Sequence, residues 1–312
     1  MKCVTTIHEL RSDLKPSRGK IIGFVPTMGY LHEGHLSLVE RAKKMCDVVV
    51  MSIFVNPLQF GPTEDLEKYP RDLARDTALA EANGVDFLFT PSVEEMYPTA
   101  SKTLVTVKDI TDSLCGASRP GHFDGVATVV SKLFNIVQPD YAFFGMKDAQ
   151  QVAVIQQMVS DLNMPVTIVP CEIVREADGL ALSSRNVYLN EEQRRQALVL
   201  FRSLNTVKQA FDNGERRTAA LKEAAVSAIS KSPEARIDYV EIREYPSLAE
   251  IETIDGEALV ALAVYFENTR LIDNIKLSVR GGNAHVSHHD ESQNSPGHGD
   301  RSELELCGQY NN

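Results

Sequence analysis

Short, nearly continuous apolar runs alternate with helix-like segments through the first half of the 312-residue chain. Strands that are buried on both faces have this continuous apolar character, and their alternation with helices is typical of a parallel sheet covered by helices. The expected strands are 21–25, 48–55, 85–89, 141–144 and 166–169. Between the later runs, apolar positions at helical spacing predict helices over 124–137 and 148–162, the second with Asp148 as its N-cap. We therefore predict an α/β fold, a Rossmann-like, doubly wound parallel sheet.

The pattern changes near residue 190, where charged helical segments rich in Ala, Leu, Glu and Arg begin. It predicts helices over 191–213 and 217–231 and then three strands, over 237–241, 258–265 and 270–276. We expect residues 1–178 to form the Rossmann-like domain and residues 179–280 to form a smaller C-terminal α+β domain. Residues 281–312 are rich in Gly, Ser, Asn and His and are expected to be a disordered tail.

Composition narrows the class of protein. Hydrophobic residues make up 43% of the chain and charged residues 24%, which is ordinary for a globular protein. No apolar run approaches the ~18 residues that a membrane span requires, and the N-terminus lacks a secretory signal, so we expect a cytoplasmic protein without membrane contact. The five scattered cysteines favour reduced thiols. A net charge of −11 argues against nucleic-acid binding, so an anionic substrate would need a few local cations.

The segment Pro26-Thr27-Met28-Gly29-Tyr30-Leu31-His32-Glu33-Gly34-His35 joins the first predicted strand to a helical pattern. Leu38, Ala42 and Met45 recur at the spacing of one helix face, which places the segment in a βα turn whose helix begins near Gly34. Glycines let such a turn bend tightly, and a helix start aims free N–H groups and its positive dipole end at a ligand. The turn is therefore predicted to bind phosphate.

Two histidines of this turn, His32 and His35, would share one helical face if both lie in the first turn of the helix. Four of the eight histidines lie in the expected tail, so this pair is a concentration that the body of the chain shows nowhere else. A histidine near a turn can also simply cap or pack, and His-x-x-His can bind a metal. The metal is disfavoured because no Cys, Asp or third His stands nearby at ligand spacing, and no metal ligand is assigned.

Segments that follow the predicted strands are the other candidates, because ligands of doubly wound sheets bind outside the carboxyl ends of the strands. They are Asn56-Pro57-Leu58-Gln59-Phe60-Gly61, Gly145-Met146-Lys147-Asp148 and Val174-Arg175-Glu176. We expect them to converge with the histidine turn.

Leu182-Ser183-Ser184-Arg185 joins the two predicted domains and sets two hydroxyls beside a guanidinium, a combination that suits phosphate oxygens. Taken singly, each group favours a plainer interpretation. The segment could be a polar linker and Lys147 a solvated lysine, while Gln59 and Gln151 could be polar residues that lie beside apolar elements. Together they form a coherent site.

Seven motifs, in order, resemble those of the pantothenate synthetase family, the ATP-dependent ligases that join pantoate to β-alanine. They are Pro-Thr-Met-Gly-x-Leu-His-x-Gly-His at 26–35, Phe-Val-Asn-Pro-Leu-Gln-Phe at 54–60, Tyr-Pro-Arg at 69–71, Gly-His-Phe-Asp-Gly-Val at 121–126, Val-Arg-Glu at 174–176, Ser-Ser-Arg-Asn at 183–186 and Arg-Leu-Ile-Asp-Asn at 270–274. The resemblance covers about residues 1–280. The first motif alone indicates the wider nucleotidylyltransferase superfamily, and the later ones select this family.

The resemblance implies that pantoate attacks the α-phosphate of ATP, giving pantoyl adenylate and pyrophosphate, and that the amine of β-alanine then displaces AMP. It further implies Mg²⁺ with the ATP, a homodimer, nucleotide and pantoate binding by the first domain, and a lid role for the second.

Site residues are carried over from the family's motifs. The resemblance implies that His32, His35, Lys147 and Arg185 are catalytic, with His35 as proton donor, and that Gln59 and Gln151 bind pantoate, Gln59 also approaching β-alanine. The residues implied to bind ATP are Met28, Gly29, Tyr30, Leu31, His32, Glu33, Gly34, His35, Gly145, Met146, Lys147, Asp148, Val174, Leu182, Ser183, Ser184 and Arg185. Met146 and Leu182 depart from the family's commonest Glu and Met, and the first change could alter how Lys147 is oriented.

Two other functions stay open from the residues. One is a nucleotidylyltransferase with another acceptor, such as a cytidylyltransferase, because the histidine turn cannot itself choose the nucleotide. The other is a nucleotide-binding regulator without catalysis, which the complete set of phosphate-handling residues disfavours.

Overall fold

The computed structural model describes residues 1–61, 64 and 66–279, and the expected tail at 281–312 lies outside the described residues. Met1–Val279 form one compact unit, so the predicted boundary between residues 178 and 179 stays a prediction. Among the described residues, no helix is long and apolar enough to cross a membrane.

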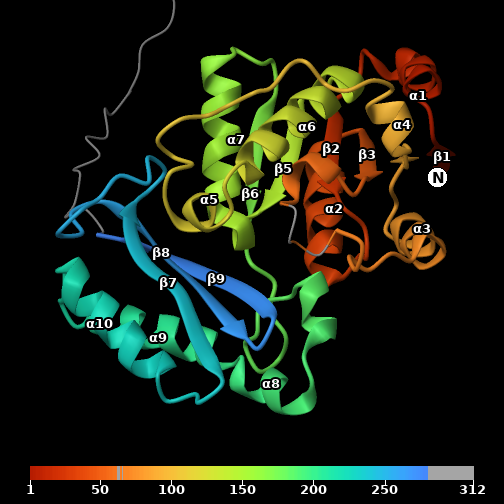
Figure 1. Ribbon diagram of the computed structural model, residues 1–312. Coiled ribbons are helices and arrows are strands. Elements are labelled where there is room, and N and C mark those ends of the chain that lie inside the picture. The colour runs from red at the N-terminus through yellow and green to blue at the C-terminus, as the bar shows by residue number, and fades with distance from the viewer. Residues whose placement is uncertain (62–63, 65, 280–312) are drawn as a thin grey trace, which may run out of the picture. The chain divides into compact units, whose positions relative to one another are not determined.

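A six-stranded, wholly parallel sheet organises the first part of the chain (Figure 1). Its strand order is β1-β4-β3-β2-β5-β6. The strands are β1 (Lys2–Val4), β2 (Ile22–Thr27), β3 (Val48–Ile53), β4 (Phe87–Phe89), β5 (Tyr141–Gly145) and β6 (Thr167–Cys171). The five predicted strands are confirmed, and β1 is an additional edge strand that the apolar pattern did not predict.

Helices cover both faces of this sheet. Consecutive residues of a strand point to opposite faces, so neighbouring strand residues pack against different helices. Phe24 and Val50 pack with α1 (Ile7–Leu14), α6 (His122–Val137) and α7 (Ala149–Asp161), whereas Val25 and Met51 pack with α2 (Glu33–Met45) and α3 (Leu73–Ala82). The doubly wound α/β fold is thereby confirmed. The remaining short elements here are α4 (Val93–Met96), α5 (Leu114–Ser118), η1 (Lys15–Ser17), η2 (Pro57–Gln59) and η3 (Met146–Asp148).

A three-stranded antiparallel sheet follows, in the order β7-β8-β9. Its strands are β7 (Ala235–Glu244), β8 (Glu257–Phe266) and β9 (Thr269–Ser278), and they share a core with α9 (Val199–Asp212) and α10 (Thr218–Ile229). This confirms the predicted α+β character of the C-terminal part. The 3-10 turn η4 (Ser184–Tyr188) and α8 (Glu191–Gln196) connect the two parts of the unit.

The helix predicted over 191–213 is wrong as a single element, since α8 ends at Gln196 and α9 begins at Val199. Gln196 accepts hydrogen bonds from Ser232 Oγ and the backbone N–H of Glu234, and Ala197 is fully buried. Tertiary packing at this corner therefore outweighs the local helix preference.

The ligand-binding end of the large sheet is set by topology. Strand β2 pairs with β3 on one side and with β5 on the other, so the chain winds away from β2 in both directions. Crevices form where the winding reverses, outside the carboxyl ends of the strands. The segments that follow β2 and β5 flank this position.

Candidate functional site

The turn after β2 is held in shape by a buried carboxylate. Asp76 of α3 is 1% exposed, and its two oxygens accept hydrogen bonds from the backbone N–H groups of Tyr30 and Leu31, each at 2.7 Å. Gly29 has φ +85°, a left-handed conformation that is strained for residues with a side chain. A Cβ atom added at this position would lie 3.0 Å from Asp76 Oδ2. The turn and α3 therefore fit each other closely.

Helix α2 begins directly after this turn, with His32 as its N-cap. Nδ1 of His32 accepts a hydrogen bond from the N–H of Gly34 at 3.1 Å, and Nδ1 of His35 accepts one from the N–H of His32 at 3.3 Å. A side chain at position 34 would place Cβ 2.9 Å from the His32 ring, which explains the glycine. The predicted helix start and the pairing of the histidines are confirmed, with ring centroids 4.1 Å apart.

These hydrogen bonds fix the protonation pattern of both rings. A backbone N–H can only donate, so each Nδ1 carries a lone pair and the ring proton is on Nε2. Desolvation is the main cause that lowers the pKa of His32 to about 4 and of His35 to about 3, and the nearby Lys147 cation lowers both further. Both rings are half-buried by area, with their open parts toward a cavity closely walled by protein. At neutral pH they are uncharged hydrogen-bond donors.

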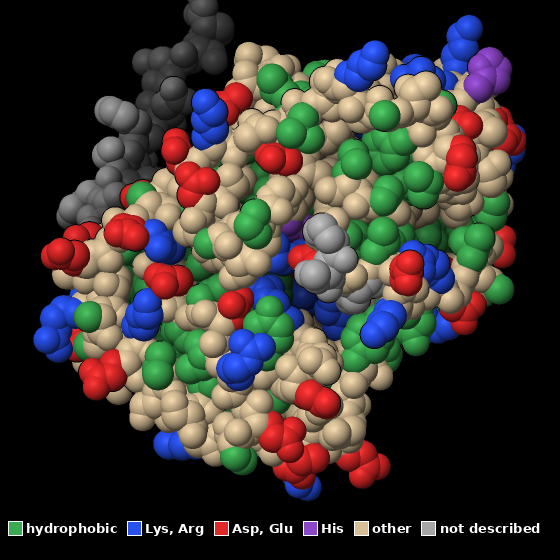
Figure 2. All heavy atoms as spheres, in the orientation of Figure 1, with side chains coloured by type: hydrophobic (Ala, Val, Ile, Leu, Met, Phe, Trp, Pro, Cys, Tyr) green, Lys and Arg blue, Asp and Glu red, His purple; other side chains and the backbone are tan. Residues whose placement is uncertain are grey.

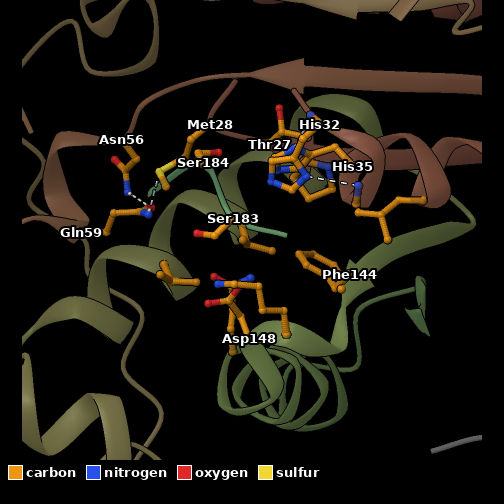
Figure 3. A pocket seen from close by; sticks show the side chains of 18 of the residues that line it. Thr27, Met28, His32, His35, Asn56, Gln59, Phe144, Asp148, Ser183 and Ser184 are labelled. Atoms are coloured by element: carbon orange, nitrogen blue, oxygen red, sulfur yellow. Dashed lines mark hydrogen bonds and ion pairs between the residues drawn. The ribbon is translucent and has the colours of Figure 1, made fainter. Parts of the chain in front are cut away.

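The cavity beside the histidines has a volume of about 230 Å³ and is lined by all four segments expected to converge (Figure 3). Figure 3 shows His32 and His35 at one end of the view and Asn56 with Gln59 at the other. The lining includes fourteen of the residues proposed for the site from the sequence: Met28, His32, Gly34, His35, Gln59, Gly145, Lys147, Asp148, Gln151, Val174, Leu182, Ser183, Ser184 and Arg185. The predicted convergence is confirmed.

The other proposed residues lie outside this lining. Leu31 is fully buried in the core, and Tyr30 stacks under the guanidinium of Arg75 at 5.4 Å. Met146 packs beside the core and accepts a hydrogen bond at its sulfur from Tyr245. Gly29 and Glu33 are likewise not among the lining residues. Tyr30 and Leu31 support the turn through Asp76 in this structure.

Asp148 occupies the N-cap position of α7, as predicted, but its side chain makes no capping hydrogen bond. Its Oδ2 lies 3.9 Å from Nζ of Lys147 instead, inside the cavity lining. The carboxylate therefore belongs to the site and not to the helix end.

Local cations surround the cavity although the chain carries a net charge of −11. Lysine and arginine side chains line a hollow near the middle of the face in Figure 2. A second cavity of about 1000 Å³ adjoins the first, and the cations lining the two are Lys68, Arg119, Lys147, Arg185 and Arg270. This arrangement agrees with the expectation that a few placed cations hold an anionic substrate.

The amide of Gln59 is oriented by Met28 and by Asn56, and sequence reasoning gave Asn56 no role of its own. Oε1 of Gln59 accepts from Nδ2 of Asn56 at 3.2 Å, and its Nε2 approaches the sulfur of Met28 at 3.0 Å. Asn56 is 1% exposed, donates also to the carbonyl of Gly125, and accepts from Tyr97 Oη. Its place in the motif at 54–60 was the available signal.

Arg119 and His122 form a second missed group beside Gln59. Nε and Nη2 of Arg119 bind both oxygens of Glu64 at 2.6 Å, and Nη1 lies 3.0 Å from Nε2 of His122. Because the guanidinium can only donate, Nδ1 of His122 carries the proton and donates to the carbonyl of Gln59 at 2.8 Å. Desolvation and then the Arg119 charge lower the pKa of His122 to about 4.

Comparison with known proteins decides the identity. Residues 2–276 match the pantoate-beta-alanine ligase family. The chain is 58% identical over 281 residues to the pantothenate synthetase of Caldicellulosiruptor saccharolyticus, an alignment that covers 89% of this chain and 100% of that protein. It is 59% identical over 276 residues to that of Pelotomaculum thermopropionicum, covering 88% and 98%. The chain belongs to the pantoate-beta-alanine ligase family. The family resemblance and the ligase class predicted from the motifs are thereby confirmed.

Solved structures of this family share the fold. A pantothenate synthetase from Thermus thermophilus superposes with a TM-score of 0.85 at 50% identity, covering 88% of this chain and 99% of that one. A pantoate-beta-alanine ligase from Francisella tularensis, crystallised with beta-gamma ATP and beta-alanine, gives 0.73 at 35% identity, covering 88% and 97%.

Metal ligands are sparse in this ligase. Among residues 1–61, 64 and 66–279, no cluster of three or more His, Cys, Asp or Glu side chains could hold a metal ion. A magnesium ion that accompanies a nucleotide needs only one or two carboxylates besides the phosphates. Asp148 meets that need in the cavity lining, so the residues fit a metal that arrives with its nucleotide.

Proposed function

We propose that this ligase condenses (R)-pantoate with β-alanine to pantothenate at the cost of ATP, through a pantoyl-adenylate intermediate, in the biosynthesis of pantothenate and coenzyme A. The observation that carries the proposal is the single cavity in which the histidine turn, Lys147, Ser183-Ser184-Arg185, Gln59 and Gln151 meet. The family membership of the chain supports the same reaction.

In the first step a carboxylate oxygen of pantoate attacks the α-phosphorus, and the bond to the bridging oxygen of pyrophosphate breaks. In the second step the amine of β-alanine attacks the acyl carbon, AMP leaves with the electron pair, and the amine loses a proton. The protein supplies positioning and charge neutralisation, with no covalent intermediate of its own.

Phosphate groups would be held by donors of three kinds. His32 and His35 present uncharged Nε2–H groups, Lys147 and Arg185 supply positive charge, and Ser183 and Ser184 supply hydroxyls. Uncharged donors stabilise the charge that develops at the phosphorus without having to give up a proton. We propose that His35 acts in this way, as a hydrogen-bond donor, because its low pKa keeps it neutral.

Pantoate would occupy the opposite end of the cavity. Phe54, Val130 and Phe144 supply apolar lining of the cavity, and Gln59 and Gln151 supply amides for the hydroxyl and carboxylate groups. Asn56 fixes the amide of Gln59 so that its Nε2–H donates to the sulfur of Met28. Val174 would line the adenine site, because it borders the cavity in the segment after β6.

Magnesium would be bound with the ATP. We propose that Asp148 contributes a carboxylate oxygen to it, alongside phosphate oxygens and water. When bound, the ion would neutralise charge on the departing pyrophosphate, which Lys147 and Arg185 also do.

We also propose a homodimer, which rests on the family resemblance, and a cytoplasmic location. Light scattering of the purified chain should give twice the monomer mass of 34.5 kDa. A monomeric mass in active enzyme would contradict it.

Pantoate-dependent exchange of labelled pyrophosphate into ATP tests the adenylation step. Incubation with ATP, pantoate and β-alanine, with each omitted in turn, should yield pantothenate and AMP by mass detection only when all three are present. Folded protein that shows no exchange would refute the proposal. CTP-dependent turnover of a phosphorylated alcohol would favour a cytidylyltransferase, and ATP binding without product would favour a regulator.

A further inference from the structure

The Arg-Leu-Ile-Asp-Asn motif at 270–274 has no role in the reaction described above, although two of its residues reach the site. Asp273 and Asn274 lie on β9 and are 2% and 5% exposed. Both line the larger cavity beside Lys147. Buried polar side chains need partners, and the partners of this pair lie in two segments of the nucleotide site.

Asn274 contacts the segment that carries Lys147. Its Nδ2 donates one hydrogen bond to the carbonyl of Met146 and one to the carbonyl of Lys147, both at 2.9 Å. An amide NH₂ group has two hydrogens, so its donor capacity is used fully on these two adjacent carbonyls. The side chain of Lys147 is 21% exposed on a flexible four-carbon stem, so the backbone position sets where its ammonium can reach.

Asp273 contacts the segment after β6 in the same manner. Nη1 and Nη2 of Arg175 bind its two oxygens at 2.7 and 2.8 Å, a planar two-bond arrangement that defines direction as well as distance. Arg175 directly follows Val174, and its guanidinium also donates to the carbonyl of Gly179 and lies 4.7 Å from the ring centroid of Phe201. The loop from Val174 to Leu182 is thereby tied to β9, and its ends meet through a hydrogen bond from Leu182 N–H to the Val174 carbonyl.

We infer that Asp273 and Asn274 are positioning residues for the ATP half-reaction. Both residues belong to a strand of the C-terminal sheet. From there the pair sets the spacing between Lys147, on the phosphate side of the site, and Val174, on the adenine side. The inference rests on the proposed function, because it assigns those two residues to ATP. Neither Asp273 nor Asn274 needs to touch the reacting atoms.

Asn274→Asp is the sharpest test, because it keeps the size of the side chain and replaces two donors with an oxygen that repels the two carbonyls. Asn274→Ser is the milder variant, since a hydroxyl can restore one of the two hydrogen bonds. Arg175→Lys tests the other arm, because it keeps the charge and removes the two-bond fork. Lys276→Ala is the matched control on the same strand, where it removes the surface pair with Glu257 and the ammonium that lies 4.8 Å from the ring centroid of Tyr245.

Each variant is measured in both half-reactions, which are pantoate-dependent pyrophosphate exchange and release of pantothenate from added pantoyl adenylate and β-alanine. We expect Asn274→Asp to lower kcat/KM for ATP in exchange by roughly 10- to 100-fold, the effect of misplacing a reacting group. Asn274→Ser and Arg175→Lys should fall between this variant and wild type. The KM for β-alanine in the second half-reaction should stay unchanged.

A purely structural role would lower both half-reactions in parallel, in proportion to the folded fraction. That result, or exchange by all three variants equal to that of Lys276→Ala, would overturn the inference. If Asn274→Asp does not fold, Asn274→Ser and Arg175→Lys decide in the same way. Absence of exchange in wild-type enzyme would instead refute the proposed function itself, so the two failures are distinguishable.

Discussion

At the residue scale, the histidine pair is defined by what its backbone neighbours donate. The N–H groups of Gly34 and His32 occupy Nδ1 of His32 and of His35, which leaves each Nε2–H for a ligand. A positively charged imidazole would have no lone pair for these bonds. The capping role and the proposed ligand role therefore use opposite nitrogens of the same ring, and the plainer interpretation of His32 as a capping residue is correct.

Two substitutions separate these ends at His35. His35→Asn keeps an acceptor where Nδ1 stands and removes the pocket donor, whereas His35→Gln keeps a donor near the position of Nε2 and removes the acceptor. We expect His35→Asn to retain stability and to lose roughly 10²- to 10³-fold in pyrophosphate exchange, the usual cost of a missing transition-state donor. His35→Gln should keep more activity. Thermal unfolding and exchange rates measure both.

Equal exchange by the wild type and His35→Asn would contradict the donor role. The pH profile offers an independent check. Because the pKa of His35 is lowered to about 3, its protonation should not appear in the rate profile above pH 5. A loss of exchange between pH 7 and 6 that disappears in His35→Gln would show that the ring titrates near neutrality.

At this scale the sequence indicated the residues proposed to take part in the reaction, but not those that orient them. His32, His35, Lys147 and Arg185 stand in short motifs whose chemistry is local. Asp76 contacts Tyr30 across 46 residues, and Asn274 contacts Met146 across 128. Such partners follow from tertiary structure, and spacing along the chain carries no trace of them.

At the element scale, α3 supports the histidine turn. Its residues Arg75 and Asp76 hydrogen-bond to the backbone of the turn. Nη1 of Arg75 donates to the Leu31 carbonyl at 2.8 Å, and the carboxylate of Asp76 accepts from the N–H groups of Leu31 and Tyr30. Removing the acceptor would leave buried N–H groups unpaired, at a cost of about 1–3 kcal/mol each.

Asp76→Asn tests this support, because the amide would turn a donor toward one of the two N–H groups. We expect a higher KM for ATP in exchange together with reduced stability. Asp72→Ala is the control on the same helix, where Asp72 caps α3 by accepting from the Arg75 N–H. Loss of this capping hydrogen bond should lower the free energy of unfolding by about 1 kcal/mol without changing the KM for ATP. The KM from exchange kinetics and urea unfolding measure the two effects, and an equal KM in both variants would refute the role.

Strands that are buried on both faces could be predicted from the sequence, whereas a helix boundary that is set by tertiary packing could not. Strands β2 and β3 read as continuous apolar runs because both of their faces are covered, by α6 and α7 on one side and α2 and α3 on the other. The break between α8 and α9 carries no proline or glycine, so helix propensity alone predicts one helix there. The three-residue strand β1 is too short to show a pattern.

At the scale of the whole molecule, the site depends on buried groups that the fold keeps uncharged or paired. His32, His35 and His122 all have a lowered pKa, and burial is the first cause in each case. Arg119 and Arg175 are neutralised by Glu64 and Asp273. Lys147 and Arg185 line the smaller cavity beside them.

The lowered histidine pKa values make the fold sensitive to acid. In the unfolded chain His122 takes up a proton near its ordinary pKa of 6.5, whereas in the folded protein it stays neutral down to about 4. The unfolded state therefore binds more protons between these values, and the free energy of unfolding must fall as the pH drops from 6.5 toward 4. Above pH 7 this contribution is fully present.

His122→Asn should reduce that pH dependence, because Asn can donate to the Gln59 carbonyl without titrating. We expect the wild type to lose about 2 kcal/mol more than this variant in unfolding free energy between pH 7 and pH 5, which is the linkage effect of one such histidine. Urea unfolding at both pH values measures it. Thr128→Val, a buried change on the same helix that removes an acceptor of the Val105 N–H, is the control. It should lower stability equally at both pH values, and an identical pH dependence in the wild type and His122→Asn would show that His122 is charged in the folded protein.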